Sequence, residues 1–341
     1  MKILVIGGTS GFIGTGVVRR LAGLGHDVTV FHRGETNADL PASVREILGN
    51  RQHLSDFSSK FKAFNPQVVI DNFLRYEQEA LDLVGVFRGI SERIVAISSQ
   101  DVYRNFGLVL GREDTEPNAL PIGEDGMLRS VLYPYRGIVA DEDDPKYNYD
   151  KIPVEKVIMD DAEIAGTVLR LPATYGPGDK QHRLFEYLKR MDDGREFILL
   201  GDAEADWRWT HGYVDNVADA IVLAATDERA KGRIYNVGEP DALGREKFVE
   251  AIGRAAGWNG KIITLPQSDL PEHLQSPVIF ERDMTVDTGR IRTELGYKEA
   301  VPRETALRET VEWERANPPD EIDQAYFNYA TEDAAIAQRE L

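Results

Sequence analysis

Short apolar runs alternate along the first half of the chain with segments of helical spacing. Residues 3–6 (ILVI) form the first run, and a glycine-rich turn, the helix-like VVRRLAGLG and a second run at 27–33 follow. Further runs lie at 67–71, 93–98 and 167–171, with helical segments between them. Strands that are buried on both faces of a parallel sheet read as unbroken apolar runs. The pattern therefore predicts an α/β fold with a doubly wound parallel sheet.

The turn after the first run carries glycines in the spacing GxxGxxG, at Gly8, Gly11 and Gly14. Between a strand and a helix, such glycines allow a tight turn, a close approach of the backbone to a pyrophosphate, and packing of the helix on the strand. The helix N-terminus then offers free N–H groups to the phosphates. We expect a dinucleotide to bind over the whole loop, which consists of Gly8, Thr9, Ser10, Gly11, Phe12, Ile13 and Gly14. A purely structural glycine turn is the alternative.

The end of the second run indicates which dinucleotide binds. An acidic residue there would bind the 2′-hydroxyl of NAD, whereas an arginine can accommodate the 2′-phosphate of NADP. The chain has His32 and Arg33 at this place. The sequence thus favours NADP over NAD, although Arg33 as a solvated residue or one stacked on the adenine stays open.

The segment YNYDK places a phenol, Tyr147, four residues before an ammonium, Lys151. On a helix these positions share a face, and the lysine charge would lower the pKa of the phenol toward neutrality. Such a phenol could donate and accept protons in catalysis. An exposed helix pair is the alternative. Pro153 is tolerable in this helix only if the helix begins near Lys151 or kinks there.

The domain boundaries follow from where the pattern changes. We expect residues 1–170, with 212–238 returning, to form a Rossmann domain that binds NAD(P). Residues 171–211 and 239–320 would form a smaller C-terminal α+β lobe that binds substrate, in which 183–202 reads as a helix and a strand. Residues 321–341 would be a tail that docks on the body or on a partner subunit.

Composition narrows the classes of function. The 341 residues carry 58 acidic and 40 basic side chains, for a net charge of −18, which argues against nucleic acid as a partner. Because the chain has no cysteine, disulfides, thiolate catalysis and cysteine-based metal sites are excluded. The six histidines form no tight motif, so we expect no metal. We expect neither a signal peptide nor a membrane span, and we expect a cytoplasmic protein.

These features together resemble the extended short-chain dehydrogenase/reductase family, the NAD(P)-dependent sugar epimerases and dehydratases. The likeness runs through VIGGTSGFIG, ISSQDVY at 97–103, YNYDK, VLRLPATYGPGD at 168–179, GYVDNVADAI at 212–221 and GRIYNVGE at 232–239. The resemblance implies that Tyr147 is the acid/base at the substrate, that Lys151 binds the nicotinamide ribose, and that Ser99 holds the same substrate oxygen. It also implies cofactor contacts from Asn50 near the adenine and from Pro172.

Other positions depart from the family pattern. Ala173 stands where the members that bind nucleotide sugars carry an asparagine, and Trp209, with Arg208 beside it, replaces an arginine. Asp101 falls where dehydratases keep a catalytic glutamate, so it is either a base or a turn residue. The long segment between Ser99 and Tyr147 is either a lid over the substrate, gripping an anion with Arg136, or a solvated loop. Arg183 and Arg208 are further candidates for substrate binding.

Three functions are compatible with the sequence. The first is an epimerase or dehydratase that acts on a hydroxyl or keto group of a sugar or sugar nucleotide. The second is an NADPH-dependent reductase or dehydrogenase of a smaller carbonyl compound. The third is a non-catalytic sensor or RNA-associated relative that binds NAD(P). The resemblance also implies a homodimer.

Overall fold

The computed structural model describes residues 1–9, 11–36, 39–139 and 141–338. Its centre is a seven-stranded sheet in the order β10-β6-β5-β4-β1-β2-β3, and every neighbouring pair in it is parallel. The strands are β1 (Lys2–Ile6), β2 (Asp27–His32), β3 (Arg45–Leu48), β4 (Val68–Asp71), β5 (Arg93–Ser99), β6 (Ala165–Leu171) and β10 (Arg233–Asn236). The prediction of a doubly wound parallel sheet is confirmed, and the five apolar runs are its strands β1, β2, β4, β5 and β6.

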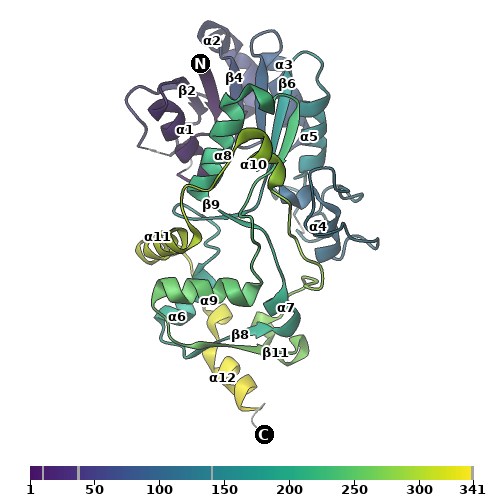
Figure 1. The fold of residues 1–341 in the computed structure, drawn as a ribbon, viewed down its shortest axis with the longest axis vertical. Coiled ribbons are helices and arrows are strands. Elements are labelled where there is room, and N and C mark those ends of the chain that lie inside the picture. Colours follow the sequence, from purple (N-terminus) through teal and green to yellow (C-terminus); the bar gives the residue numbers. More distant parts are fainter. Residues whose placement is uncertain (10, 37–38, 140, 339–341) are drawn as a thin grey trace.

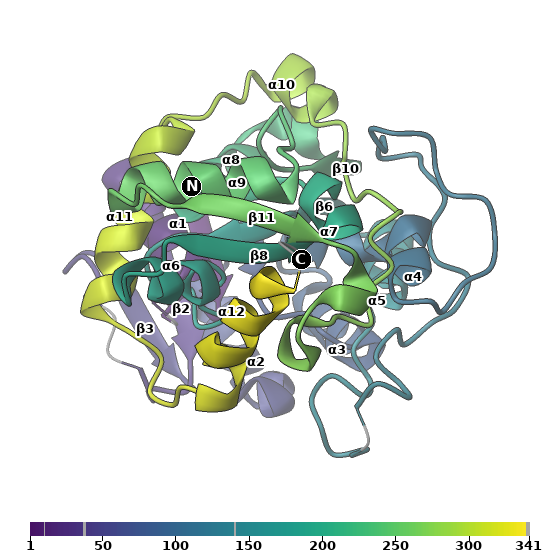
Figure 2. The same cartoon turned by 90° about the horizontal axis from the view of Figure 1, so that it is seen from below.

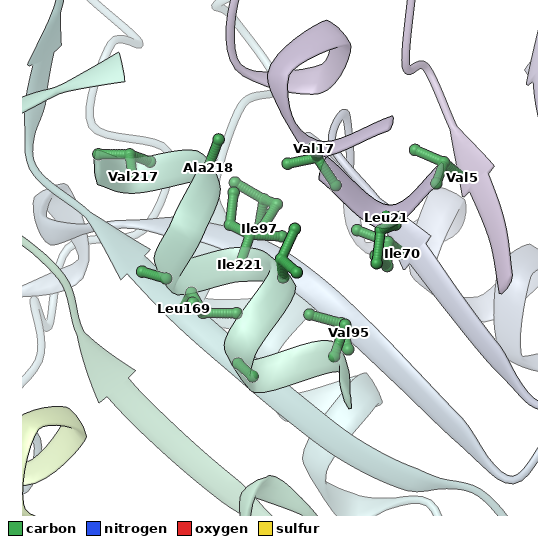
Figure 3. Packing of buried hydrophobic residues seen from close by; sticks show 14 of the residues in the cluster. Val5, Val17, Leu21, Ile70, Val95, Ile97, Leu169, Val217, Ala218 and Ile221 are labelled. Atoms are coloured by element: carbon green, nitrogen blue, oxygen red, sulfur yellow. The ribbon is translucent and has the colours of Figure 1, made fainter. Parts of the chain in front are cut away.

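Alternate residues of the strands feed two separate cores, one on each face of the sheet. Ile3 and Val5 of β1 belong to one core, and Leu4 and Ile6 belong to the other. The first face is covered by α1 (Ile13–Gly23), α8 (Val214–Thr226) and α10 (Gly289–Leu295), and Figure 3 shows side chains of α1 and α8 against those of β1, β4, β5 and β6. The second face is covered by α2 (Ser58–Phe64), α3 (Glu77–Phe87) and α5 (Lys151–Asp160).

A second group of elements lies at the far end of the molecule from the sheet's first strands (Figure 1). It contains the parallel pair β8 (Phe197–Gly201) and β11 (Lys261–Leu265). Around this pair lie the helices α6 (Phe185–Asp192), α7 (Asp202–Asp206), α9 (Arg245–Ala256) and α11 (Arg303–Ala316). A short parallel pair, β7 (Ala173–Tyr175) and β9 (His211–Tyr213), lies where the chain passes between this group and the large sheet. The helix and strand that the sequence predicts within 183–202 are α6 and β8.

The C-terminal segment docks on this second group. Helix α12 (Tyr329–Ala337) lies beneath β8 in Figure 2, and Ala335 and Ile336 pack against a core formed by Leu199, Leu265 and Leu270. Glu332 is fully buried and pairs with Arg190 of α6 at 2.9 Å. Of the two docking places that the sequence left open, the chain's own body is the one used here.

The segment between α4 (Arg104–Val109) and α5 forms no helix or strand in the part that the structure describes. It extends along the side of the molecule as a long loop (Figure 2). Tyr135 nevertheless turns inward, and its ring makes edge contacts with Phe106 at 6.2 Å and with Tyr149 at 5.7 Å between centroids. This loop therefore contributes an aromatic wall beside the start of α5.

Candidate active site

The glycine loop between β1 and α1 has the close contacts that a dinucleotide site requires. A Cβ on Gly14 would lie 2.8 Å from the carbonyl oxygen of Gly7, and Gly11 has a φ of +82° that favours glycine. The hydroxyl of Thr15 accepts a hydrogen bond from the Gly11 amide at 3.1 Å. Thr9 is buried, Phe12 and Ile13 are half-buried, and Ser10 lies outside the described residues. The loop thus leaves its backbone close to the N-terminus of α1, which fits the pyrophosphate of a dinucleotide.

Two contacts beside this loop were not predicted from the sequence. A Cβ on Gly178 would fall 2.2 Å from the oxygen of Gly11, so the turn after β7 lies directly against the loop. The ring of Phe73, after β4, lies so close to Gly7 that a Cβ there would be 2.1 Å from it. Pro172 is buried just before β7, and a Cβ on Gly212 would be 2.7 Å from its ring. The GPGD motif at 176–179 was the only signal for the first contact.

The end of β2 places His32 and Arg33 in different environments. The His32 ring is buried, receives the Gly34 amide on Nδ1 at 3.2 Å, and contacts Glu46 with Nε2 at 2.7 Å. Because Nδ1 accepts this hydrogen bond, Nε2 carries the hydrogen and donates it to Glu46, so protein groups hold both ring nitrogens. Arg33 is exposed and pairs with exposed Glu35 at 2.8 Å. Such a surface pair is weak, so Arg33 can exchange its partner for a ligand.

Asn50 occupies a capping position after β3. Its side-chain oxygen accepts the amide of Gln52 at 3.0 Å and caps the short helix η1 (Arg51–Phe57). The side chain is exposed, and its amide nitrogen donates to Oε1 of Gln52 at 3.5 Å. Arg51, which follows it, binds Asp71 of β4 at 2.6 Å.

Helix α5 begins at Lys151, with Asp150 as its N-cap, which accepts the amide of Ile152 at 2.9 Å. Pro153 is the third residue of the helix, where an N–H has no partner within the helix anyway. Tyr147 therefore precedes the helix, and the expectation that it shares a helix face with Lys151 is wrong. Its hydroxyl instead contacts Glu142 at 3.1 Å near the surface.

Tyr149 occupies the place beside Lys151 that the sequence analysis gave to Tyr147. Its hydroxyl is 2.8 Å from Oδ2 of Asp101, which follows β5, and it also interacts with the side chain of Ser99. The Lys151 ammonium lies 5.6 Å from the centre of the Tyr149 ring. Ser99, Asp101 and Lys151 are thus brought together by the fold, and the tyrosine that joins them is Tyr149.

Lys151 is buried and is held by backbone oxygens at the ends of two strands. Its ammonium donates to the carbonyl of Ile97 at 2.9 Å and to that of Leu74. Burial lowers the pKa of Lys151 to about 8, against the opposing charges of Asp101, Asp71 and Glu79. Lys151 therefore loses its proton near pH 8, and its charge depends on whether its neighbours are protonated.

The pKa values of the Tyr149 phenol and of the Asp101 carboxyl beside it are both raised. Burial raises the pKa of Asp101, against the charges of Arg129 and Lys151 and the hydrogen bond from Tyr149. Burial, together with the charge of Asp101, raises the pKa of Tyr149 well above its ordinary value, against the hydrogen bond with Ser99. The sequence predicts that the Lys151 charge lowers the pKa of Tyr147, whereas the tyrosine that lies beside Lys151 is Tyr149, and its pKa is raised.

The three arginines proposed to bind substrate each have different neighbours. Arg136 stacks on Tyr133, with 3.8 Å between its guanidinium carbon and the ring centre, and donates to Asn148 at 2.7 Å. Arg183 pairs with Asp179 at 2.7 Å. Arg208 is exposed and lines a surface hollow of about 530 Å³ formed by Leu120, Ala203, Asp206, Trp207, Phe280, Glu281 and Asp283.

No helix within the described residues is long and apolar enough to cross a membrane.

Comparison with known sequences places the chain among NAD-dependent enzymes. A sequence model of the NAD dependent epimerase/dehydratase family matches residues 144–238, which contain Tyr147, Tyr149 and Lys151. The chain is 26% identical to a 2′-dehydrokanamycin reductase of Streptomyces kanamyceticus, over 81% of this chain and 72% of the relative. It is 25% identical to a dTDP-glucose 4,6-dehydratase of Salmonella typhimurium, over 93% of each.

Solved structures share the fold. A UDP-glucose 4-epimerase of Thermotoga maritima, solved with UDP-glucose, matches with a TM-score of 0.66 and 20% identity, over 93% of this chain and 99% of that one. An NAD-dependent NDP-hexosamine 5,6-dehydratase involved in tunicamycin biosynthesis matches with a TM-score of 0.66 and 19% identity, over 94% and 99%. Together with the glycine loop and the parallel sheet, these findings confirm the resemblance to the NAD-dependent epimerases and dehydratases, which are extended short-chain dehydrogenases/reductases.

Proposed function

We propose that this protein catalyses NAD(P)-dependent oxidoreduction at a hydroxyl- or keto-bearing carbon of a sugar or sugar nucleotide. The observation that carries the proposal is the position of the Tyr149 hydroxyl between Ser99, Asp101 and Lys151. A bound nicotinamide would exchange a hydride with the substrate carbon. The loop from Gly8 to Gly14 would hold the pyrophosphate of that cofactor.

The protein groups would handle the proton and the substrate oxygen. Ser99 and Tyr149, whose side chains interact, would each donate a hydrogen bond to a hydroxyl or carbonyl oxygen of the substrate. Tyr149 would exchange the proton of that oxygen, and Lys151, next to its ring, would stabilise the charge that develops on the phenol. In this proposal Tyr149 takes the acid/base role that the resemblance assigned to Tyr147.

Two tyrosine variants test the assignment. Tyr149→Phe is expected to lower the rate of hydride transfer by about 10²- to 10⁴-fold, with dinucleotide binding nearly unchanged. Tyr147→Phe is the matched control, because it removes the same hydroxyl at a distance of two residues, and it should keep nearly full activity. Loss of activity in Tyr147→Phe alone would restore Tyr147 to the mechanism.

The substrate class has two candidates. Several relatives are named for dTDP-glucose, and solved neighbours contain UDP-sugars, which supports a nucleotide sugar and epimerase or dehydratase chemistry. Ala173 and Trp209, in place of the asparagine and arginine that would contact a diphosphate, support a compound without a nucleotide and a net reductase. The relative named for 2′-dehydrokanamycin supports the same candidate. Cofactor retained without net absorbance change during turnover favours the first, and steady NADPH consumption favours the second.

We propose NADP as the preferred dinucleotide because Arg33 is exposed and can release Glu35 for a 2′-phosphate. We also propose that the elements around β8 and β11 form the substrate-binding lobe, and that Arg136, Arg183 and Arg208 contribute to substrate binding. A homodimer is the proposed assembly. Light scattering of the purified protein tests that assembly directly.

A further inference from the structure

Asp101 and Tyr149 form a carboxyl–phenol pair in which the carboxyl is buried and the phenol is half-buried. The Asp101 side chain is buried, its Oδ2 lies 2.8 Å from the phenol oxygen, and its Oδ1 has no hydrogen-bond partner among the described residues. We propose that Asp101 is a proton-supplying partner of Tyr149 and that the pair equips the site for carbonyl reduction. This inference rests on the proposed function, and it replaces the base role that the resemblance gave to Asp101.

The cations nearest to this pair direct their hydrogen bonds elsewhere. Arg129 donates to the backbone oxygen of Asp101 at 2.6 Å and to the Asp150 carboxylate at 2.9 Å. Lys151 donates to the carbonyls of Ile97 and Leu74. The Asp101 carboxyl is thus near two positive charges, but the hydrogen bond that it makes is to the phenol. Buried carboxyl groups in that position favour their neutral, protonated form.

The groups that face the pair come from three parts of the chain. The long loop supplies Arg129 and Tyr135, the start of α5 supplies Asp150 and Lys151, and the end of β5 supplies Ser99. Behind Lys151 lie Asp71, Glu79 and Arg51. Because these groups interact, the pair should titrate with pKa values that belong to both members.

The protonation state of Asp101 decides whether Tyr149 can donate its hydroxyl hydrogen to a substrate oxygen. A protonated Asp101 donates through Oδ2 to the phenol oxygen and leaves the phenol hydrogen free for a substrate oxygen. An ionised Asp101 accepts that hydrogen and leaves none for the substrate. The site is therefore ready to give a proton while Asp101 is protonated.

The balanced step is a reduction by a dihydronicotinamide dinucleotide. The hydride forms a C–H bond at the carbonyl carbon, and the π electrons of the C=O bond move to its oxygen. That oxygen takes the Tyr149 proton, and the phenolate takes the Asp101 proton along the 2.8 Å contact. The carbonyl is reduced to an alcohol, the dinucleotide is oxidised, and Asp101 recovers its proton from solvent after product leaves.

Carbon-13 NMR of protein labelled at tyrosine Cζ and at aspartate Cγ tests the pair without any substrate. Asp101→Asn and Tyr149→Phe assign the two signals. The Asp101 signal is expected to titrate well above the ordinary carboxyl range, and the Tyr149 signal to shift with the same midpoint. Glu142→Gln is the matched control, since it changes the exposed carboxylate beside Tyr147, and it should leave both signals unchanged. An Asp101 that titrates in the ordinary range, or a Tyr149 signal that ignores it, overturns the inference.

A kinetic comparison separates this inference from the proposed function. With keto sugars as probes and NADPH as reductant, the wild-type rate should fall as pH rises through the Asp101 midpoint. Asp101→Asn can still donate a hydrogen bond to the phenol oxygen but has no proton to give to the phenolate. Its rate at low pH should therefore drop by at least about tenfold, and the rate should no longer fall as pH rises. An active Tyr149→Phe would overturn the proposed function. An inactive Tyr149→Phe together with an unchanged pH profile in Asp101→Asn would overturn only the role of Asp101.

Discussion

Asp150 and Arg129 form an ion pair of 2.9 Å in which neither side chain is more than 1% exposed. The same carboxylate caps α5 through the Ile152 amide and accepts the amide of Tyr133 at 2.6 Å. One buried side chain thus ties the long loop to the start of the helix that begins with Lys151. Because Tyr149 immediately precedes Asp150, this tie also fixes the position of the phenol in the site.

Removal of the arginine from this pair should be costly. In Arg129→Met the Asp150 carboxylate stays buried without its cation, and we expect a loss of about 3–5 kcal/mol in the free energy of unfolding. Urea denaturation measures it. Arg254→Met, at an exposed position in α9, is the control and should change stability by less than about 0.5 kcal/mol. Equal stability of the two variants would contradict the stabilising role of the Arg129–Asp150 ion pair.

Two glycines of α1 should respond in opposite ways to alanine. In Gly14→Ala the new Cβ would meet the Gly7 oxygen at 2.8 Å, so the helix must move away from the loop and dinucleotide binding should fall at least tenfold. In Gly23→Ala the Cβ meets nothing within 4 Å, and we expect a gain of about 0.5–1 kcal/mol from helix propensity. Fluorescence titration with NADPH measures binding by Gly14→Ala, and urea denaturation measures the stability of Gly23→Ala. Normal NADPH binding by Gly14→Ala would count against a pyrophosphate over this loop.

Cofactor preference should depend on a single exposed pair. Arg33→Ala is expected to weaken NADPH binding by about tenfold or more while NADH binding changes little, because a charge-assisted hydrogen bond to a phosphate is lost. Glu35→Gln frees the arginine and should strengthen NADPH binding. Dissociation constants for NADPH and NADH, measured at one salt concentration, show whether Arg33 sets the cofactor preference. Parallel losses for the two dinucleotides in Arg33→Ala would remove Arg33 from the discrimination.

The buried Lys151 should make stability depend on pH in the alkaline range. Its pKa is about 8 in the folded chain and about 10.5 when unfolded, so between these values the unfolded state binds more protons. Stability should therefore rise as pH increases from about 8 to 10.5, by up to about 1.4 kcal/mol per pH unit from this group. Urea denaturation at several pH values measures the slope. Lys151→Met should lack this contribution, and an identical slope in that variant would exclude Lys151 as its source.

The local pattern of the sequence was sufficient to predict the strands and the glycine loop around the candidate site. The apolar runs gave the strands, since a strand buried on both faces needs an unbroken run whatever its neighbours are. The glycine spacing after β1 gave the loop, because its backbone requirements are local. Ser99 at the end of β5 and Lys151 at the start of α5 were found through motif order, and Pro153 indicated that the helix starts late.

The choice between Tyr147 and Tyr149 was not available from spacing. The four-residue interval to Lys151 has meaning only inside a helix, and the helix begins at Lys151 because Asp150 caps it. Where the chain before it runs depends on Arg129, which comes from a loop far back in the sequence. No local pattern encodes such a contact.

What the sequence by itself determined is the parallel sheet, the glycine loop and the resemblance to a family, since each depends on residues close together in the chain or on the order of motifs. Only the tertiary structure decided that Tyr149 meets Asp101, that Gly178 lies on Gly11, and that α12 docks through Glu332 and Arg190. Each of these contacts joins segments far apart in sequence, and burial then raises the pKa values of Asp101 and Tyr149 where they meet.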